Sequence, residues 1–313
     1  MVQCTHHILG KRRSCILNLP DKVLCAGIRE NPDFLPDPAS RNAVPIFLKE
    51  MRKVMELDKP IFIQYLSFLT HLVHGDWGRS FYNQQPVLTQ LLDVLPNTIE
   101  LVISGILIGI LIGVPPGLLA AVKPNSLFDH VVRIGTLIGI SIPIFVMGIF
   151  LISIFSLKLD LLPAIGMSRS EGLGGHLAHL ILPAFSCGLM MMASIARLIR
   201  AAMLDVLNRD YILTARAKGV IECLVICKHG LRNALLPLIT YLGIYVNILL
   251  GSAVLVEVIF TRPGVGRVIV EAIKSNDFPI VQTTIMLYAG AVVLVNLFID
   301  IIYCFVDPRI AYR

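Results

Sequence analysis

Long apolar runs separated by short polar segments dominate the chain after residue 100. Four of these runs contain no charged residue and reach the roughly 20 residues that a helix needs to cross a bilayer. A fifth run is shorter, and we expect it to extend through Arg197, because a long basic side chain can reach the lipid surface. The pattern predicts an all-α, polytopic membrane protein with five visible spanning helices, at residues 101–122, 134–157, 180–196, 233–256 and 278–299.

The first hundred residues differ from the rest. Residues 1–30 carry Lys11, Arg12 and Arg13, and Pro20 interrupts their one apolar stretch, so neither a spanning helix nor a signal peptide is predicted. We expect an atypical N-terminal segment at 1–30, amphipathic helices and loops outside the cytoplasm at 31–97, and a transmembrane domain at 98–313. Helical spacing predicts two short helices in the middle part, one with Leu48, Met51, Val54 and Met55, the other with Ile61, Tyr65, Phe68, Leu69 and Leu72.

Glycine recurs at every fourth position of the first run, at Gly105, Gly109, Gly113 and Gly117. This spacing puts the four residues on one helix face, where small residues let a neighbouring backbone come close in lipid. Chance occurrence in a glycine-rich segment is the alternative, and we favour helix packing. The Pro115-Pro116 pair and Pro143 are expected to kink their helices.

Charge indicates the orientation. The net charge is +6, and the basic residues gather at the ends of apolar runs, which is a topology signal and not a sign of nucleic acid binding. Residues 123–133, 200–233 and 307–313 are basic and fall on one side if five helices alternate, so we assign that side to the cytoplasm. The longer connections at 158–179 and 261–277 then lie outside, the second containing a tight turn at 263–267.

Catalytic and metal-binding patterns are missing from the sequence. It contains no GxxxxGK[ST], HExxH or GxSxG motif, and the spans carry almost no ionisable residue at mid-depth. Glu100, Glu257 and Asp300 stand at span ends, where we interpret them as interfacial. The seven cysteines follow no disulfide spacing, and Cys223, Cys227 and His229 are poorly spaced for zinc. We therefore expect no cofactor and no metal, and an energy source on a partner.

The polar segment at residues 210–237 has its own pattern. Asp210 is a candidate N-cap, the following residues to Lys218 contain no helix breaker, and Gly219 stands where a helix would end in a left-handed residue. A second short turn is expected from 221 to 229, ending at Gly230. The first helix would present Thr214, Ala215 and Ala217, a knob with little side-chain bulk.

This segment resembles the signature loop of the permease subunits of bacterial ATP-binding-cassette importers. It is similar, more narrowly, to that of the first permease in dipeptide, oligopeptide and glutathione systems, which shares the departures at Leu213, Thr214 and Arg232 from the broader pattern. The resemblance implies a coupling helix that sits in a groove on an ATPase subunit. The residues that it assigns to this loop are Asp210, Tyr211, Thr214, Ala215, Arg216, Ala217, Lys218, Gly219, His229, Arg232 and Asn233.

Further marks of that family follow in order, from Val256-Glu257 to Asp307-Pro308-Arg309. The resemblance implies a type I importer transmembrane fold in the bacterial inner membrane. It also implies four kinds of partner: a second homologous permease, two ATPase subunits, an extracytoplasmic solute-binding protein and the lipid bilayer. Peptides, glutathione and nickel complexes are the cargoes of similar systems. An autonomous carrier or channel and a membrane-bound enzyme are the alternatives.

The N-terminus conflicts with this reading. The family begins with a spanning helix that residues 1–30 do not supply, and five spans would put the basic residues 11–13 on the side opposite the basic tail. We favour a frameshifted or misassigned start as the explanation. An inactive, truncated copy of a permease is a further alternative.

Overall fold

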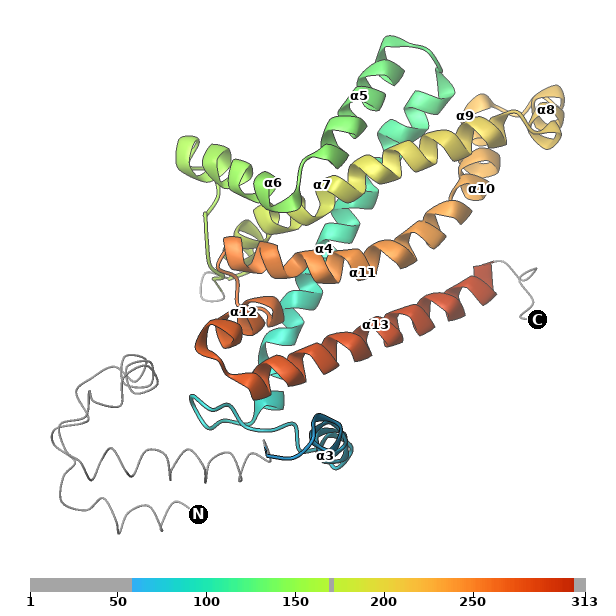
Figure 1. Cartoon of the computed structure of the whole chain (residues 1–313). Helices are drawn as coiled ribbons and strands as arrows, with labels where there is room; N and C mark the ends of the chain where they lie inside the picture. Colours follow the sequence, from blue (N-terminus) through green and yellow to red (C-terminus); the bar gives the residue numbers. More distant parts are fainter. Residues whose placement is uncertain (1–57, 169–171, 307–313) are drawn as a thin grey trace, which may run out of the picture. The chain divides into compact units, whose positions relative to one another are not determined.

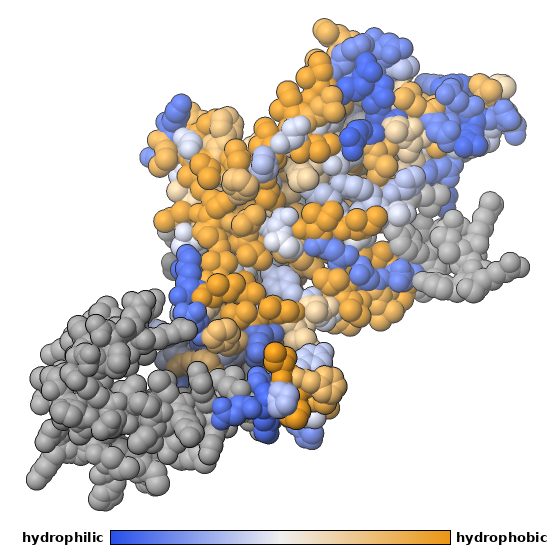
Figure 2. All heavy atoms as spheres, in the orientation of Figure 1, coloured by the Kyte–Doolittle hydropathy of each residue, from blue (hydrophilic) through white to orange (hydrophobic). Residues whose placement is uncertain are grey.

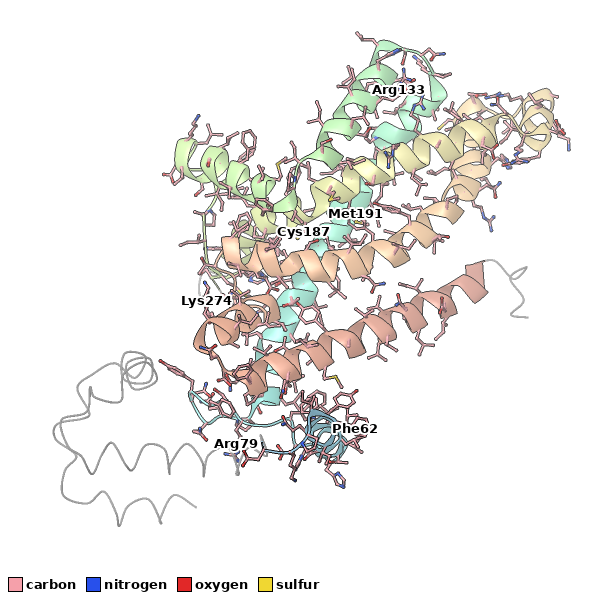
Figure 3. All side chains as sticks on the ribbon, in the orientation of Figure 1. Phe62, Arg79, Arg133, Cys187, Met191 and Lys274 are labelled. Atoms are coloured by element: carbon pink, nitrogen blue, oxygen red, sulfur yellow. The ribbon has the colours of Figure 1, made fainter. Side chains whose placement is uncertain are left out.

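A computed structural model describes residues 58–168 and 172–306, which are almost entirely helical (Figure 1). Two compact units are present, Met1–Asp76 and Trp77–Arg313. The described part of the first unit contains helix α3, Ile61–Val73, which confirms the helix predicted from the spacing of Ile61 to Leu72. Phe62 on α3, labelled in Figure 3, is 70% exposed. Our expectations for residues 1–30, for the helix around Leu48 and for the basic tail lie outside the described residues.

The second unit contains four helices that are long and apolar enough to cross a membrane. They are α4 (Val87–Val122), α7 (Gly172–Leu207), α11 (Leu236–Ile259) and α13 (Phe278–Val306), and they confirm four of the five predicted spans. Two of them extend well beyond their apolar runs. Helix α4 starts before the domain boundary that we expected at residue 98, and α7 continues past Arg197 to Leu207, because charged residues do not by themselves end a helix.

The fifth predicted span, residues 134–157, is a pair of helices bent at the break before Ile144, which confirms the kink predicted at Pro143. It consists of α5 (Leu127–Ser141) and α6 (Ile144–Leu151), the latter continuing as the π-helical η2 (Ile152–Lys158), with a bend of 102° between the two parts. Pro143 lacks an N–H group and keeps Ile142 extended, at φ −86° and ψ 121°, which interrupts the helix. Pro115 and Pro116, in contrast, lie inside the continuous helix α4.

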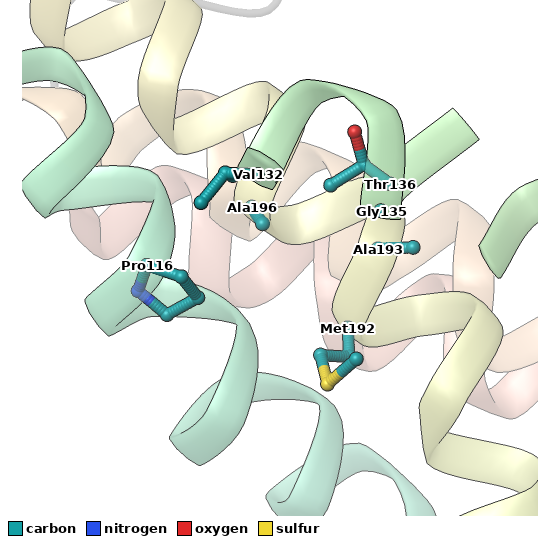
Figure 4. A pocket seen from close by; sticks show the side chains of 7 residues that line it. All are labelled: Pro116, Val132, Gly135, Thr136, Met192, Ala193 and Ala196. Atoms are coloured by element: carbon teal, nitrogen blue, oxygen red, sulfur yellow. The ribbon is translucent and has the colours of Figure 1, made fainter. Parts of the chain in front are cut away.

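Helix α5 also begins earlier than expected, within the basic connection predicted at 123–133. The Ser126 hydroxyl accepts a hydrogen bond from the Asp129 N–H at 3.2 Å and caps the helix at Leu127. A small cavity of about 190 Å³ lies between α4, α5 and α7, and Figure 4 shows the side chains that line it. Its lining residues, Pro116, Val132, Gly135, Thr136, Met192, Ala193 and Ala196, include no titratable side chain, so we interpret it as a packing gap.

The glycine face of α4 packs directly against α7, and all four glycines are buried. A Cβ atom on Gly113 would lie 2.7 Å from the carbonyl oxygen of Met192, and one on Gly117 would lie 2.5 Å from that of Ala196. The other two glycines meet the side chains of Cys187 and Met191, which Figure 3 labels on α7 where it crosses α4. The two backbones therefore approach each other more closely than any residue with a side chain would allow.

The start of α4 and the last part of the chain together form a second, smaller core. A short helix, α12 (Val265–Ser275), connects α11 to α13 and ends at Asn276 in the left-handed conformation, with φ +57°. Val87 and Leu91 at the start of α4, Val265 and Ala272 of α12, and Ile280 of α13 form one buried cluster. Figure 2 shows a largely hydrophobic outer surface, with hydrophilic residues gathered around α8 (Asp210–Ala217) and the start of α5. This distribution fits an apolar belt in lipid and a polar end in water.

The contact between α4 and α7 can be tested with one added methyl group. We expect Gly117→Ala to destabilise the chain by about 1–3 kcal/mol, because the new Cβ meets backbone atoms that cannot rotate away. Thermal unfolding of the purified chain in detergent measures the effect.

The matched control is Gly251→Ala on α11, where a Cβ would meet nothing within 4 Å. Alanine there improves helix propensity, so the midpoint of unfolding should stay unchanged or rise. Equal midpoints for the two variants would contradict the close approach of α4 and α7.

Candidate functional site

The polar segment between α7 and α11 begins with α8, Asp210–Ala217. Its N-cap is Arg209, whose backbone is extended at φ −80° and ψ 146°, so the prediction of Asp210 as N-cap is wrong by one residue. Asp210 is instead the first helical residue, where a carboxylate is favourable at the positive end of the helix dipole. The prediction for Gly219 is confirmed, because this residue is left-handed at φ +73° just after the helix.

The chain after Gly219 is helical almost without interruption. It runs through α9 (Glu222–Leu224), the π-helical η3 (Val225–Leu231) and α10 (Arg232–Ala234) to α11. The expected stop at Gly230 is therefore wrong. Gly230 is buried, and a Cβ there would lie 3.0 Å from the Met203 Cε atom, so this glycine provides room for α7 and does not end a helix.

Two side-chain contacts fix α8 to this helical run. The Arg216 guanidinium donates to both carboxylate oxygens of Glu222, at 2.6 and 3.2 Å, across the turn that contains Gly219. This contact lowers the pKa of Glu222 and raises that of Arg216. At the other end of α8, the Asn233 amide donates to the Tyr211 hydroxyl at 2.9 Å. Ile212, fully buried, anchors the helix between them.

The exposed face of α8 mixes small and large side chains, since Tyr211, Leu213 and Arg216 are exposed beside Thr214 and Ala217. Thr214, Ala217, Lys218 and Gly219 are exposed and Ala215 is half-buried. The Thr214 hydroxyl donates back to the Asp210 carbonyl at 2.9 Å, which reduces its reach further. Of the remaining predicted residues, Arg232 is exposed and His229 is half-buried on the following helical run. The structure thus brings the eleven predicted loop residues into one segment at one end of the second unit (Figure 1).

A buried carboxylate lies far along the chain from this segment, and sequence reasoning missed it. Glu257 is fully buried, so its interpretation as an interfacial residue is wrong. Its carboxylate accepts hydrogen bonds from the Thr98 hydroxyl at 2.6 Å and from the N–H groups of Gly266 and Arg267 at 2.7 and 3.2 Å. The first N–H groups of a helix have no partner within it, and here Glu257 supplies one for α12.

Further polar contacts connect α4 to the connection between α11 and α12. The Asn97 amide donates to the Pro263 carbonyl at 2.7 Å. The side chain of Arg262 is fully buried and donates to Glu100 at 2.5 Å, and His176 of α7 contacts the other oxygen of Glu100 at 2.5 Å. The predicted tight turn at 263–267 is therefore largely the first turn of α12, held by acceptors from α4 and α11.

The sequence did contain a signal for this cluster. Polar residues at the start of one apolar run, Asn97, Thr98 and Glu100, face polar residues at the end of another, Glu257 and Arg262. Gly264 stands where a Cβ atom would collide with the Glu257 carboxylate. An acid and a base near two span ends could have indicated a buried pair, but spacing alone does not show which ends meet.

A second buried ion pair joins α5 to α7. Asp129 is fully buried, and the Arg200 guanidinium donates to both of its oxygens, through Nη2 at 2.8 Å and also through Nε. The Asn125 N–H donates to the same carboxylate at 3.0 Å. Arg133, labelled on α5 in Figure 3, lies 3.8 Å away. Because each charged group has a partner within the chain, we assign a structural role to this pair.

Metal and catalytic chemistry find little support in this arrangement. Within residues 58–168 and 172–306, no three side chains of histidine, cysteine, aspartate or glutamate are grouped so that they could hold a metal ion. Cys223 and Cys227 are exposed on the helical run after α8, and a loss of solvation, followed by the neighbouring Cys223, raises the pKa of Cys227. A raised pKa makes a thiol less reactive at neutral pH.

Comparison with known proteins identifies the family. Residues 105–312 match the family described as the binding-protein-dependent transport system inner membrane component. The chain is 41% identical over 278 residues to the di/tripeptide transport system permease protein DppB of Pseudomonas aeruginosa, covering 82% of this chain and 83% of the relative. It is 39% identical over 281 residues to the dipeptide permease DppB of Escherichia coli K12, covering 82% and 83%.

Another relative is the glutathione transport system permease protein GsiC of Shigella flexneri, 36% identical over 263 residues, with 84% of each chain covered. Among solved structures, a chain of the MetNI methionine ABC transporter in an inward-facing conformation aligns with a TM-score of 0.58 and 22% identity. The alignment covers 71% of this chain and 99% of the other. It shows that the fold is that of an importer transmembrane domain.

The role of Glu257 can be tested by removing its carboxylate. We expect Glu257→Ala to destabilise the chain by at least about 2 kcal/mol, because two buried donors and one partly buried donor lose their acceptor and each buried loss costs roughly 1–3 kcal/mol. Glu257→Gln keeps one oxygen and should cost less. Chemical denaturation in detergent measures the loss.

Glu271→Ala is the matched control, on the same helix α12. Glu271 forms an exposed pair with Arg267 at 2.7 Å, and such pairs contribute about 0–1 kcal/mol. If the two alanine variants lost the same stability, Glu257 would not be the acceptor that holds α12.

Proposed function

This chain belongs to the family of binding-protein-dependent transport system inner membrane components, and from that premise we propose that it is a permease subunit of an importer for small peptides. It is a multi-pass inner membrane protein of the ATP-binding-cassette type. One observation carries the proposal for the cargo. Relatives that are 36–41% identical over more than four fifths of the chain are named as permeases for dipeptides, tripeptides or glutathione.

We propose that this subunit works with partners of the kinds that its family requires. A second, related permease would complete the path, two ATPase subunits would supply the energy, and a solute-binding protein would deliver the peptide from outside. The basic segments between α4 and α5 and between α7 and α11 would face the cytoplasm, and α12 would face the opposite side. The absence of ATP-binding motifs from the sequence fits an energy source on a separate chain.

The contact with an ATPase subunit would be made by α8. Thr214, Ala215 and Ala217 present little side-chain bulk, and the exposed Leu213 beside them adds an apolar side chain that a groove could take up. Closure of the ATPase pair on binding ATP would move α8, and the Arg216–Glu222 and Asn233–Tyr211 contacts would transmit this movement to α11. The two permeases would then change between inward-open and outward-open states.

The alternatives explain fewer observations. An autonomous carrier would need ionisable groups that can bind a coupling ion, but Asp129 with Arg200 and Glu100 with Arg262 already pair within the chain. A membrane-bound enzyme would need a catalytic group, and the family is one of transport components. An isolated carrier would transport peptide in liposomes without ATPase subunits, whereas we expect this chain alone to transport none.

Crosslinking tests the contact at α8. In a chain whose seven native cysteines are replaced, a cysteine at Ala217 should form a disulfide or a short crosslink with an ATPase subunit of the assembled importer. Asp160→Cys is the matched control, because Asp160 is also exposed but lies in the connection after η2, on the side that we assign to the exterior. Capture of an ATPase at position 160 and not at 217 would reject the proposed orientation.

Charge exchange tests the Arg216–Glu222 ion pair between α8 and α9. We expect Arg216→Glu to reduce peptide uptake per ATP hydrolysed, because it places two like charges across the turn. The double variant R216E/E222R should restore coupling. Uptake and hydrolysis are measured together in proteoliposomes that hold the complete importer.

The exposed pair of Arg209 with Asp205, joined at 2.8 Å just before α8, provides the control for charge exchange. The variant R209D/D205R should couple as the wild type does. Failure of R216E/E222R to restore coupling, with assembly intact, would mean that this pair does not transmit movement.

A further inference from the structure

A polar recess lies between α11 and α13, in a surface that is otherwise apolar. It has a volume of about 380 Å³, and its polar lining residues are Thr240, Asn247, Asn296 and Asp300. Figure 2 shows hydrophilic atoms between these two helices, within a largely hydrophobic surface. Both helices are long and apolar enough to span the membrane, where polar side chains are costly and usually functional.

The hydrogen bonds in the recess leave one strong acceptor without a donor. The Asn247 Nδ2 group donates to the Asn296 Oδ1 atom at 2.7 Å, so the two amides hold each other across the two helices. The Asn247 Oδ1 atom is buried and has no hydrogen-bond partner among residues 58–168 and 172–306. A buried acceptor without a partner costs free energy, which a ligand that donates a hydrogen bond to it would recover.

The remaining lining groups favour the same kind of ligand. Asp300 adds an exposed carboxylate and Thr240 an exposed hydroxyl, and none of the residues that line the recess is basic. An anionic group would therefore meet the charge of Asp300 without a compensating cation. A group with several N–H donors and a positive charge satisfies both the carboxylate and the free amide oxygen.

We propose that this recess is a subsite on the translocation path that binds the α-ammonium group of a peptide, with Asn247 Oδ1 and Asp300 as acceptors. The inference rests on the proposed function, since it gives a contact for the cargo of that importer. The volume of the recess lies at the low end of the roughly 300–1,000 Å³ of small-molecule sites, which suits a short peptide. One wall of the recess is α11, which the helical run from α9 connects to α8. Movement at α8 therefore changes the surroundings of the recess.

Protection of an introduced cysteine tests the subsite. Ile244 lines the recess and is 61% exposed, so Ile244→Cys, in a chain without other cysteines, reports access by a water-soluble maleimide. The complete importer is placed in lipid nanodiscs without nucleotide, and the probes are trialanine and N-acetyl-trialanine. We expect trialanine to slow labelling by about tenfold and the acetylated peptide, which lacks the ammonium group, to leave it unchanged.

Variants within the recess identify the acceptors. Asp300→Asn and Asn247→Leu, each added to Ile244→Cys, should abolish protection by trialanine. Leu255→Cys is the control for labelling, because Leu255 is 48% exposed on the same face of α11, about three turns from Ile244, and does not line the recess. Its labelling should not respond to trialanine. Ser252→Ala, which removes a hydroxyl bonded to the Ile248 carbonyl, should leave protection at Ile244→Cys intact.

Three outcomes would overturn the inference. Equal protection by the two peptides would exclude recognition of the ammonium group, and protection that survives both variants would exclude these acceptors. A cysteine at position 244 that never reacts, but crosslinks to the second permease, would make the recess a contact between subunits. ATP-driven uptake of trialanine by the same assembled importer tests the proposed function separately, so that its failure is not confused with failure of the subsite.

Discussion

The close contact between α4 and α7 is the interaction on which the second unit depends. Water is absent from the hydrocarbon core, so helices there associate by close van der Waals packing and not by burying apolar surface. Gly105, Gly109, Gly113 and Gly117 allow that packing along four successive turns, because no side chain separates the two backbones. On its other faces α7 contacts α5, α6 and α11, so the position of α7 sets the positions of most of the other spans.

Polar groups inside this apolar assembly follow a second constraint, because each needs a partner within the protein. Glu257 and Thr98 accept hydrogen bonds from the first N–H groups of α12, and Asp129 pairs with Arg200. These contacts join different helices at both ends of the unit, so each also fixes a relative position. Asn247 departs from the pattern, since its amide oxygen has no donor in the described part of the chain.

The sequence predicted the spans well, because length and absence of charge in lipid leave few alternatives to a helix. It did not predict which proline ends its helix. Pro143 ends α5 and Pro116 lies inside α4, although both residues lack the same N–H group. The outcome depends on whether neighbouring helices accommodate the freed carbonyl, which is a property of tertiary packing.

The candidate site, too, was predictable where local sequence decides and not where tertiary contacts decide. The residues of the α8 segment could be named from their pattern, and the left-handed Gly219 could be predicted from local backbone chemistry. The bond from Arg216 to Glu222 could not, since it depends on the path of the turn between them. Glu257 was placed at the interface because a carboxylate at a span end is usually wet, and only the three-dimensional neighbours reveal its donors.

The helical run that follows α8 has a mechanical consequence. From Glu222 to Ile259 the backbone stays hydrogen-bonded through α9, η3, α10 and α11, and the Leu235 N–H bridges the last junction by donating to the Leu231 carbonyl at 2.9 Å. Pro237 lies at the start of α11, and Leu235 and Ile239 on either side of it keep their helical bonds, so it does not loosen the rod. This rod is not uniform, because π-helical turns such as those of η3 are a recognised place for a helix to kink, so bending between α8 and α11 concentrates there.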